Sequence, residues 1–147
     1  MERALIFAAL QILVCIYALG KGGAPERWAA VFYGAAFAAS IAATLFTNSF
    51  YSTLEWGVFA VDLVLAAALL LLALHANRYW TLWAASIQIV AICAHLAKML
   101  VPEILAPAYA AVLIVWSYAA ILLLMIGTMR HRSRVIRYGS DMSWSLA

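Results

Sequence analysis

Long apolar runs separated by short polar breaks make up the pattern of this chain. Five such runs occur, and each is close to the roughly 20 residues that an α-helix needs to cross the ~30 Å hydrocarbon core of a bilayer. The runs are continuous rather than alternating, which favours helices and excludes a β-barrel. The pattern predicts an all-α integral membrane protein, a bundle of five transmembrane helices. Its spans are residues 4–20, 28–47, 55–75, 79–101 and 108–128.

The breaks between the runs carry residues that stop and start helices. Lys21–Arg27 contains two glycines followed by a proline, the order expected between two helices. The polar turn His75–Arg78 is so short that the third and fourth spans must be antiparallel neighbours. Pro102 and Pro107 bracket the last break. An alternative has four spans, with the region between these prolines re-entrant or the first run lying at the membrane interface.

Composition supports insertion into a membrane. The chain is 69% hydrophobic and 10% charged, with a mean hydropathy of +1.02, whereas soluble domains carry about 25% charged residues. Nothing in 147 residues is long enough for a separate soluble domain. The predicted organisation is a transmembrane helical bundle over residues 1–129 and a basic cytoplasmic tail over residues 130–147.

The distribution of basic residues predicts the orientation. Five spans place the termini on opposite sides, and a cytoplasmic tail then puts seven of the nine basic residues in the cytoplasm, leaving Arg3 and Lys98 outside. By the positive-inside rule the N-terminus is outside and the C-terminus is cytoplasmic, with a bacterial inner membrane as the expected location. The tail arginines are expected to contact lipid headgroups. They are Arg130, Arg132, Arg134 and Arg137.

Polar side chains inside the third and fourth spans are the candidate site. An ionised side chain at mid-membrane costs roughly 2.5–3.5 kcal/mol or more unless it finds a partner. The hairpin register brings Asp62 within a turn of His95, and Glu55 within a turn of Lys98. Gln88 lies on the same helical stripe as the two basic residues. The predicted intramembrane polar cluster is Asp62, His95, Lys98, Gln88, Gln11 and Glu55.

This cluster has several interpretations. It can be structural, with Asp62 paired to Lys98 or His95 and the amides bonded across helices to fix their register. It can be a proton or ion pathway, because intramembrane acids and histidines mark such relays. Some of its groups can instead face a partner protein, or bind a lipid or small molecule.

The second span is small-residue-rich in its middle. Small side chains four residues apart let the backbone of another helix approach closely, which favours association inside lipid. The segment is therefore a predicted helix packing face. Its residues form two rows, Gly34, Ala38, Ala42 and Ala35, Ala39, Ala43.

Recognisable chemistry is absent from the sequence. It has no H-E-x-x-H, no G-x-S-x-G and no His/Cys cluster of metal-ligand spacing. His75 and His95 are about 22 Å apart along the membrane normal, too far to share a haem iron. The sequence predicts a non-enzymatic protein without a catalytic site, metal or cofactor.

We expect a structural or accessory subunit of a larger membrane complex or homo-oligomer; the alternative is a proton or cation transporter using the Asp/His/Lys cluster. Expected partners are the bilayer and other membrane subunits or copies of itself, not nucleic acid.

Overall fold

The computed structural model describes residues 2–45 and 56–144. Every named secondary-structure element in these ranges is an α-helix. Four of them are long and apolar enough to cross a membrane, and the predicted all-helical fold is confirmed over these residues. The exception is α2, whose alanines, glycine and charged first turn lower its hydropathy, so five spans stay a prediction. The helices are α1 (Glu2–Lys21), α2 (Ala24–Leu45), α3 (Trp56–His75), α4 (Tyr79–Leu100) and α5 (Ala106–Tyr138).

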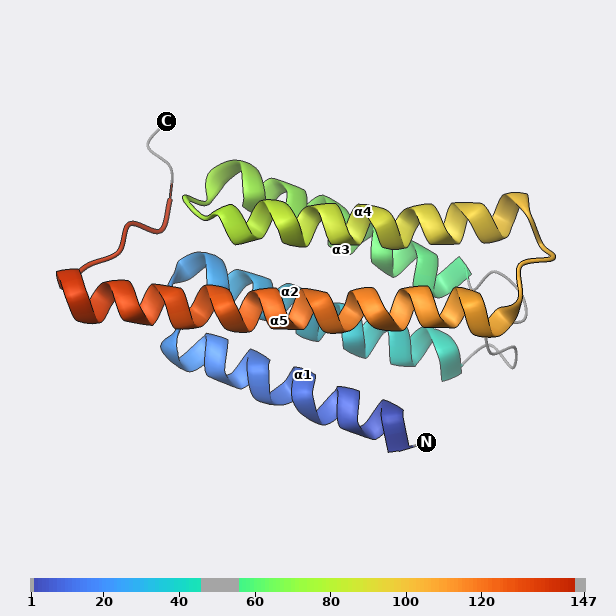
Figure 1. The fold of residues 1–147 in the computed structure, drawn as a ribbon, viewed down its shortest axis with the longest axis horizontal. Helices are drawn as coiled ribbons and strands as arrows, with labels where there is room; N and C mark the ends of the chain where they lie inside the picture. Colours follow the sequence, from blue (N-terminus) through green and yellow to red (C-terminus); the bar gives the residue numbers. More distant parts are fainter. Residues whose placement is uncertain (1, 46–55, 145–147) are drawn as a thin grey trace.

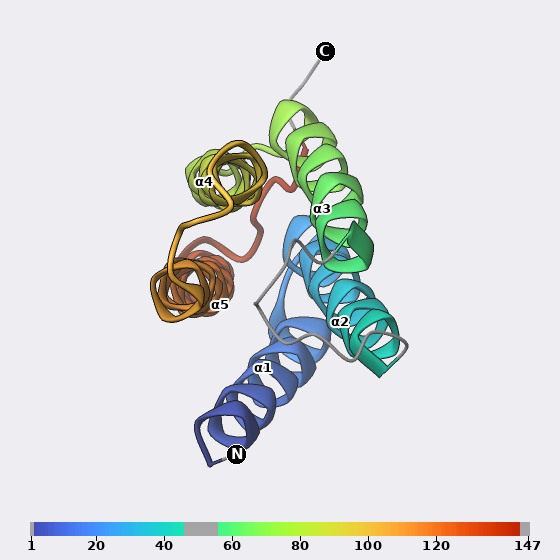
Figure 2. The same ribbon diagram turned by 90° about the vertical axis from the view of Figure 1, so that its right-hand side faces the viewer.

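The five helices form a ring in chain order. Each helix packs on the next, α5 closes the ring against α1, and α2 also contacts α5 (Figure 2). The α1–α2 connection, the α3–α4 turn and the last turns of α5 all lie at the left-hand end in Figure 1, here called the basic end. The N-terminus and the α4–α5 loop lie at the opposite end (Figure 1).

Helix α5 is longer than the predicted fifth span. It continues beyond residue 128 to Tyr138, so the first part of the predicted basic tail is helical. No glycine or proline interrupts the chain there until Gly139, which takes a left-handed φ of 74° and donates its N–H to Val135 O at 2.9 Å. At about 1.5 Å per residue, the 33 residues of α5 form a helix longer than a bilayer core is thick.

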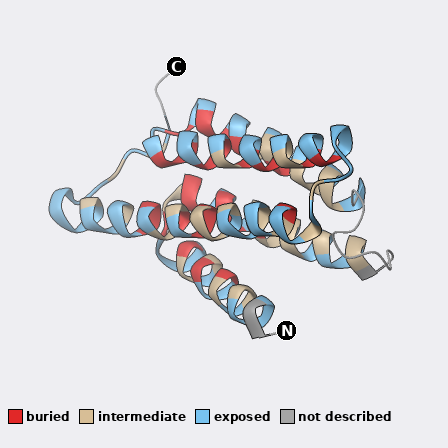
Figure 3. Ribbon diagram, turned by 45° about the vertical axis from the view of Figure 1, so that its right-hand side comes forward, coloured by how far each residue is buried: buried red, intermediate tan, exposed pale blue. Residues whose placement is uncertain are grey.

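The centre of the ring is filled by an apolar layer. Leu69 of α3 and Leu124 of α5 are fully buried, and Ala84 of α4 packs with them in the same hydrophobic cluster. Figure 3 shows that burial is concentrated on one side of each helix, while much of the remaining surface is exposed. That surface is apolar, as expected for helices that face lipid. The apolar layer separates polar groups at the two ends of the bundle.

Helices α4 and α5 approach closely at Gly127. A Cβ built there would lie 2.6 Å from the indole nitrogen of Trp80, which is itself held by a hydrogen bond to Glu26. We expect Gly127→Ala to destabilise the fold by about 1–3 kcal/mol through overpacking. Gly34→Ala is the matched control, because a Cβ at Gly34 meets nothing within 4 Å. Thermal unfolding in detergent compares the two, and equal effects would contradict this packing.

Candidate functional site

A hydrogen-bonded chain links α3, α4 and α5 in the half of the bundle away from the basic end. His95 Nε2 lies 2.8 Å from Asp62 Oδ2, and Gln88 donates from Nε2 to Asp62 Oδ1 at 2.9 Å. Tyr109 OH lies within hydrogen-bonding distance of His95 Nδ1. Asp62 therefore has a partner on each carboxylate oxygen, and His95 has one on each ring nitrogen.

The three helices also enclose this chain sterically. His95 is 1% exposed, with Phe59 of α3 against one side of its ring and Tyr109 edge-on to it, at centroid distances of 5.4 and 5.5 Å. Asp62 keeps 19% of its side chain exposed. The imidazole is thus fixed in place by packing as well as by hydrogen bonds.

The arrangement accommodates two protonation states of His95. With neutral imidazole and ionised Asp62, Nε2–H donates to the carboxylate and Tyr109 donates its hydroxyl proton to Nδ1. With imidazolium, Nδ1–H donates to the tyrosine oxygen instead, and Asp62 and His95 form an ion pair. Both states fit the same heavy-atom positions, with the tyrosine hydroxyl hydrogen turned away from Nδ1 in the second.

Lys98 and Gln11 do not join this chain. Lys98 was a predicted partner of Asp62, but its ammonium donates to Pro102 O at 2.8 Å and Ile104 O at 2.7 Å. The lysine side chain extends past the C-terminal end of its own helix, where a cation is favourable, to carbonyls of the α4–α5 loop. Gln11 donates to Tyr33 O at 2.9 Å and so joins α1 to α2. Glu55 lies outside the described residues.

A second polar cluster, which the sequence analysis missed, lies at the basic end. Arg78, in the α3–α4 turn, donates from Nε to Glu26 Oε1 at 3.2 Å and from Nη2 to Asp141 Oδ2 at 2.7 Å. Trp80 also donates to Glu26 Oε1, at 3.1 Å. The Glu26 side chain is 0% exposed, and its Oε2 has no partner among the described residues. Arg78 therefore joins α2, the α3–α4 turn and the segment after α5.

Asp141, which follows the turn that ends α5, is the second acid of this cluster. His131 Nδ1 lies 2.6 Å from Asp141 Oδ2, and Arg134 donates from Nε to Oδ1 at 2.8 Å. Burial opposes ionisation of Asp141, but the hydrogen bonds from Arg134 and His131 and the charges of Arg78 and Arg134 outweigh it. Together they hold the pKa of that carboxyl below its ordinary value. Arg134, one of the arginines predicted to contact lipid headgroups, binds Asp141 and keeps 36% of its side chain exposed, and Arg130, Arg132 and Arg137 are exposed.

The residues after α5 fold back onto the α3–α4 turn. Ala76 and Trp144 form an antiparallel bridge, and Asn77 N donates to Ser143 O at 3.1 Å. Arg78 Nη1 donates to Met142 O at 2.6 Å. Residues 140–144, the C-terminal strap, are thus tied to the bundle by side-chain and backbone contacts.

The predicted packing face of α2 is only partly used within the chain. Ala43 packs against Gly57 of α3. A Cβ added at Gly57 would lie 2.8 Å from the Cβ of Ala43. Gly34 is half-buried and has open space in front of it. Four members of the predicted face are exposed. They are Ala35, Ala38, Ala39 and Ala42.

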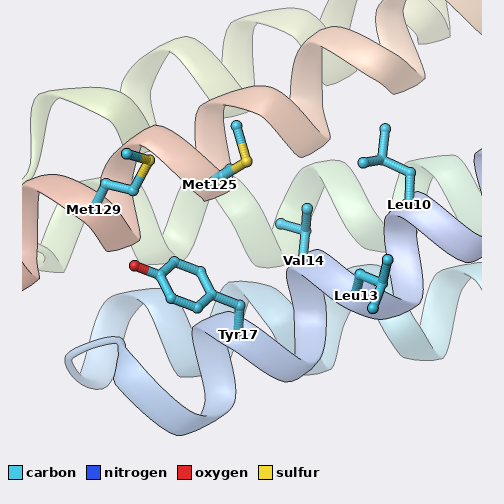
Figure 4. Close-up of a pocket in the computed structure, with 6 residues that line it drawn as sticks. All are labelled: Leu10, Leu13, Val14, Tyr17, Met125 and Met129. Atoms are coloured by element: carbon cyan, nitrogen blue, oxygen red, sulfur yellow. The ribbon is translucent and has the colours of Figure 1, made fainter.

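An apolar groove runs between α1 and α5. Figure 4 shows the side chains that line it, Leu10, Leu13, Val14, Tyr17, Met125 and Met129. None of them is charged, and none belongs to either polar cluster. Among the described residues, no group of three His, Cys, Asp or Glu side chains is arranged to hold a metal ion.

No protein-family model, curated protein or solved structure matches this chain. The geometry of its own residues is therefore the basis for assigning a function.

Proposed function

We propose that this protein is a five-span bacterial inner-membrane protein that acts without catalysis, as a structural or accessory subunit of a larger membrane complex or homo-oligomer. In this proposal α2 is the additional span, complementing the four helices whose length and hydropathy suit a membrane. Neighbouring α1 and α3 pack against it from either side.

The exposed alanines of α2 carry the proposal. Ala35, Ala38, Ala39 and Ala42 follow one another at helical spacing on the side of α2 that the rest of the chain leaves uncovered. Lipid tails gain little from such a shallow surface, whereas another helix can bring its backbone close to it. We infer that a helix from outside this chain packs there.

The intramembrane polar groups fit a static role. Asp62, His95, Lys98 and Gln11 find their hydrogen-bond partners within the bundle. Hydrogen bonds between membrane helices contribute roughly 0.6–2 kcal/mol each and specify which faces meet. In this proposal the cluster fixes the register of α3, α4 and α5, and so presents α2 in a constant orientation.

The proposed orientation has the basic end in the cytoplasm and the N-terminus outside. Lys21 and Arg27 are exposed near the α1–α2 connection, at the same end as the arginines of α5 (Figure 1). This grouping of basic residues is typical of the cytoplasmic side. Exposed Arg130, Arg132 and Arg137 would then contact anionic headgroups.

Site-directed photocross-linking in the native membrane tests the proposal. With Cys15 and Cys93 replaced by serine, Ala38→Cys and Ala67→Cys each introduce one reactive thiol on an exposed helix surface, on α2 and α3 respectively. A benzophenone attached at position 38 is expected to give an adduct of discrete protein mass, and one at position 67 is not. Protein adducts at neither position would contradict the assembly role.

Proton transfer is a second candidate function, favoured by the continuous chain from Tyr109 through His95 to Asp62. The apolar layer around Leu69 and Leu124 lies between this chain and the basic end, which is why we place the accessory role first. For a transporter, Asp62→Asn should reduce pH-driven flux in liposomes to that of protein-free vesicles. Gln11→Leu, which alters a polar group outside the chain, should leave flux unchanged. Absence of flux in the wild type would exclude this candidate.

A further inference from the structure

Three donors converge on a single carboxylate at the basic end of the bundle. Asp141 accepts from Arg78 at 2.7 Å, His131 at 2.6 Å and Arg134 at 2.8 Å, and its side chain is 7% exposed. These donors come from the α3–α4 turn and from α5, and so belong to the bundle itself. Guanidinium groups arranged around an oxyanion recognise phosphate as well as carboxylate.

The anion that occupies this site is part of a short strap. Besides Asp141, the strap is held by backbone contacts at Met142, Ser143 and Trp144. Its larger side chains are not buried, since Met142 is 57% and Trp144 40% exposed. The carboxylate, with three donors at 2.6 to 2.8 Å, is the charged anchor of the strap.

The surroundings of the site resemble the headgroup region of a membrane. Exposed Trp28 lies in the second turn of α2, and exposed Tyr79 and Trp83 lie in the first two turns of α4, at the same end of the bundle as the site. Aromatic side chains of this kind collect at the level of lipid headgroups. Exposed Arg130, Arg132 and Arg137 on the adjoining part of α5 raise the local concentration of anionic lipid.

We propose that Arg78, His131 and Arg134 form a binding site for the phosphate of an anionic phospholipid, and that this phosphate displaces Asp141 and releases the C-terminal strap. The inference rests on the proposed membrane placement, but not on the proposed accessory role. One monoanion replaces another, so the site keeps its charge balance. Glu26 stays bonded to Arg78 Nε and Trp80, and retains its place in the bundle after the exchange.

Disulfide trapping of the strap measures this exchange. In a chain lacking Cys15 and Cys93, Asn77→Cys and Ser143→Cys place two thiols on residues joined by a backbone hydrogen bond. The ordinary Cα separation of such an antiparallel pair, about 5.5 Å, suits a disulfide. The purified protein is reconstituted in phosphatidylcholine vesicles, or in vesicles also rich in phosphatidylglycerol. We expect the anionic lipid to slow cross-linking about tenfold. Equal rates in the two lipids would overturn the proposal.

Matched variants separate the site from general surface charge. Asp141→Asn should cross-link slowly in both lipids, because the strap has lost its anchor. Arg137→Gln removes one exposed arginine of the same helix while Arg130 and Arg132 remain, so it should keep most of the response to phosphatidylglycerol. Loss of that response in Arg137→Gln, or fast cross-linking of Asp141→Asn in phosphatidylcholine, would each overturn the proposal.

Inorganic phosphate added to phosphatidylcholine vesicles separates the two sources of the anion. It should leave cross-linking unchanged, because a soluble anion lacks the high local concentration of the membrane surface. If inorganic phosphate released the strap as well as the lipid does, a soluble ligand would replace the lipid in this assignment. Vesicle flotation and circular dichroism check insertion and helicity in every sample, and native-membrane cross-linking at Ala38→Cys tests the accessory role independently.

Discussion

Asp62→Ala is expected to lower the free energy of unfolding by about 3 kcal/mol, among the largest effects of any single substitution in this chain. The change removes the acceptor for both Gln88 and His95 at once. His95 is almost completely enclosed, so water cannot replace the lost carboxylate. Unfolding in mixed micelles of dodecyl maltoside and sodium dodecyl sulfate, followed by helical circular dichroism, measures the loss.

A double-mutant cycle identifies the partner of Asp62. Asp62→Ala and His95→Ala should show a coupling energy of about 0.5–3 kcal/mol, because the two side chains are in direct contact. Asp62→Ala and Lys98→Met should be additive to within about 0.5 kcal/mol, because Lys98 bonds to loop carbonyls instead. Stronger coupling of Asp62 to Lys98 than to His95 would contradict the hydrogen bonds described above.

Arg78→Met should be the other strongly destabilising change, by about 3–5 kcal/mol. It leaves the Glu26 carboxylate, which is 0% exposed, with Trp80 as its remaining donor. It also removes one of the three groups that hold Asp141. Arg137→Met, at an exposed position of α5, is the control and should change stability by less than about 0.5 kcal/mol.

A second substitution distinguishes this charge effect from lost packing. Adding Glu26→Gln to Arg78→Met should restore part of the stability, because it removes the uncompensated charge.

The pKa of Asp141 is below its ordinary value of about 3.9, so its stabilising contribution is present above that pH and is lost as pH falls through the lower folded-state pKa. Strap docking that weakened between neutral pH and pH ~5 would contradict the role of Asp141.

The helices and the Asp62–His95 contact follow from local features of the sequence. Apolar run length and the Gly and Pro breaks locate the helices, and the tight His75–Arg78 turn sets the register that brings Asp62 near His95. The partner of Lys98 could not be predicted from the sequence, because a long side chain can reach several acceptors at similar depth. Carbonyls of the loop that follows its own helix are the acceptors that it reaches.

The basic-end cluster needed the tertiary structure. Arg78 is 52 residues from Glu26 and 63 residues from Asp141 along the chain. Each of the three lies in a charged stretch that is equally typical of a membrane boundary. One signal was present in the sequence: His131 and Arg134 are three residues apart with no helix breaker before Gly139. This spacing places both on one face of an extended α5.

Native mass spectrometry of the protein, extracted gently from its own membrane, tests the assembly role most directly. The account predicts a discrete complex, containing either stoichiometric companion subunits or several copies of this chain, that dissociates when the exposed face of α2 is blocked by Ala38→Phe. The same substitution at the exposed Ala67 of α3 should leave the complex intact. A wild-type protein that is recovered only as a folded, lipid-bound monomer would contradict the account.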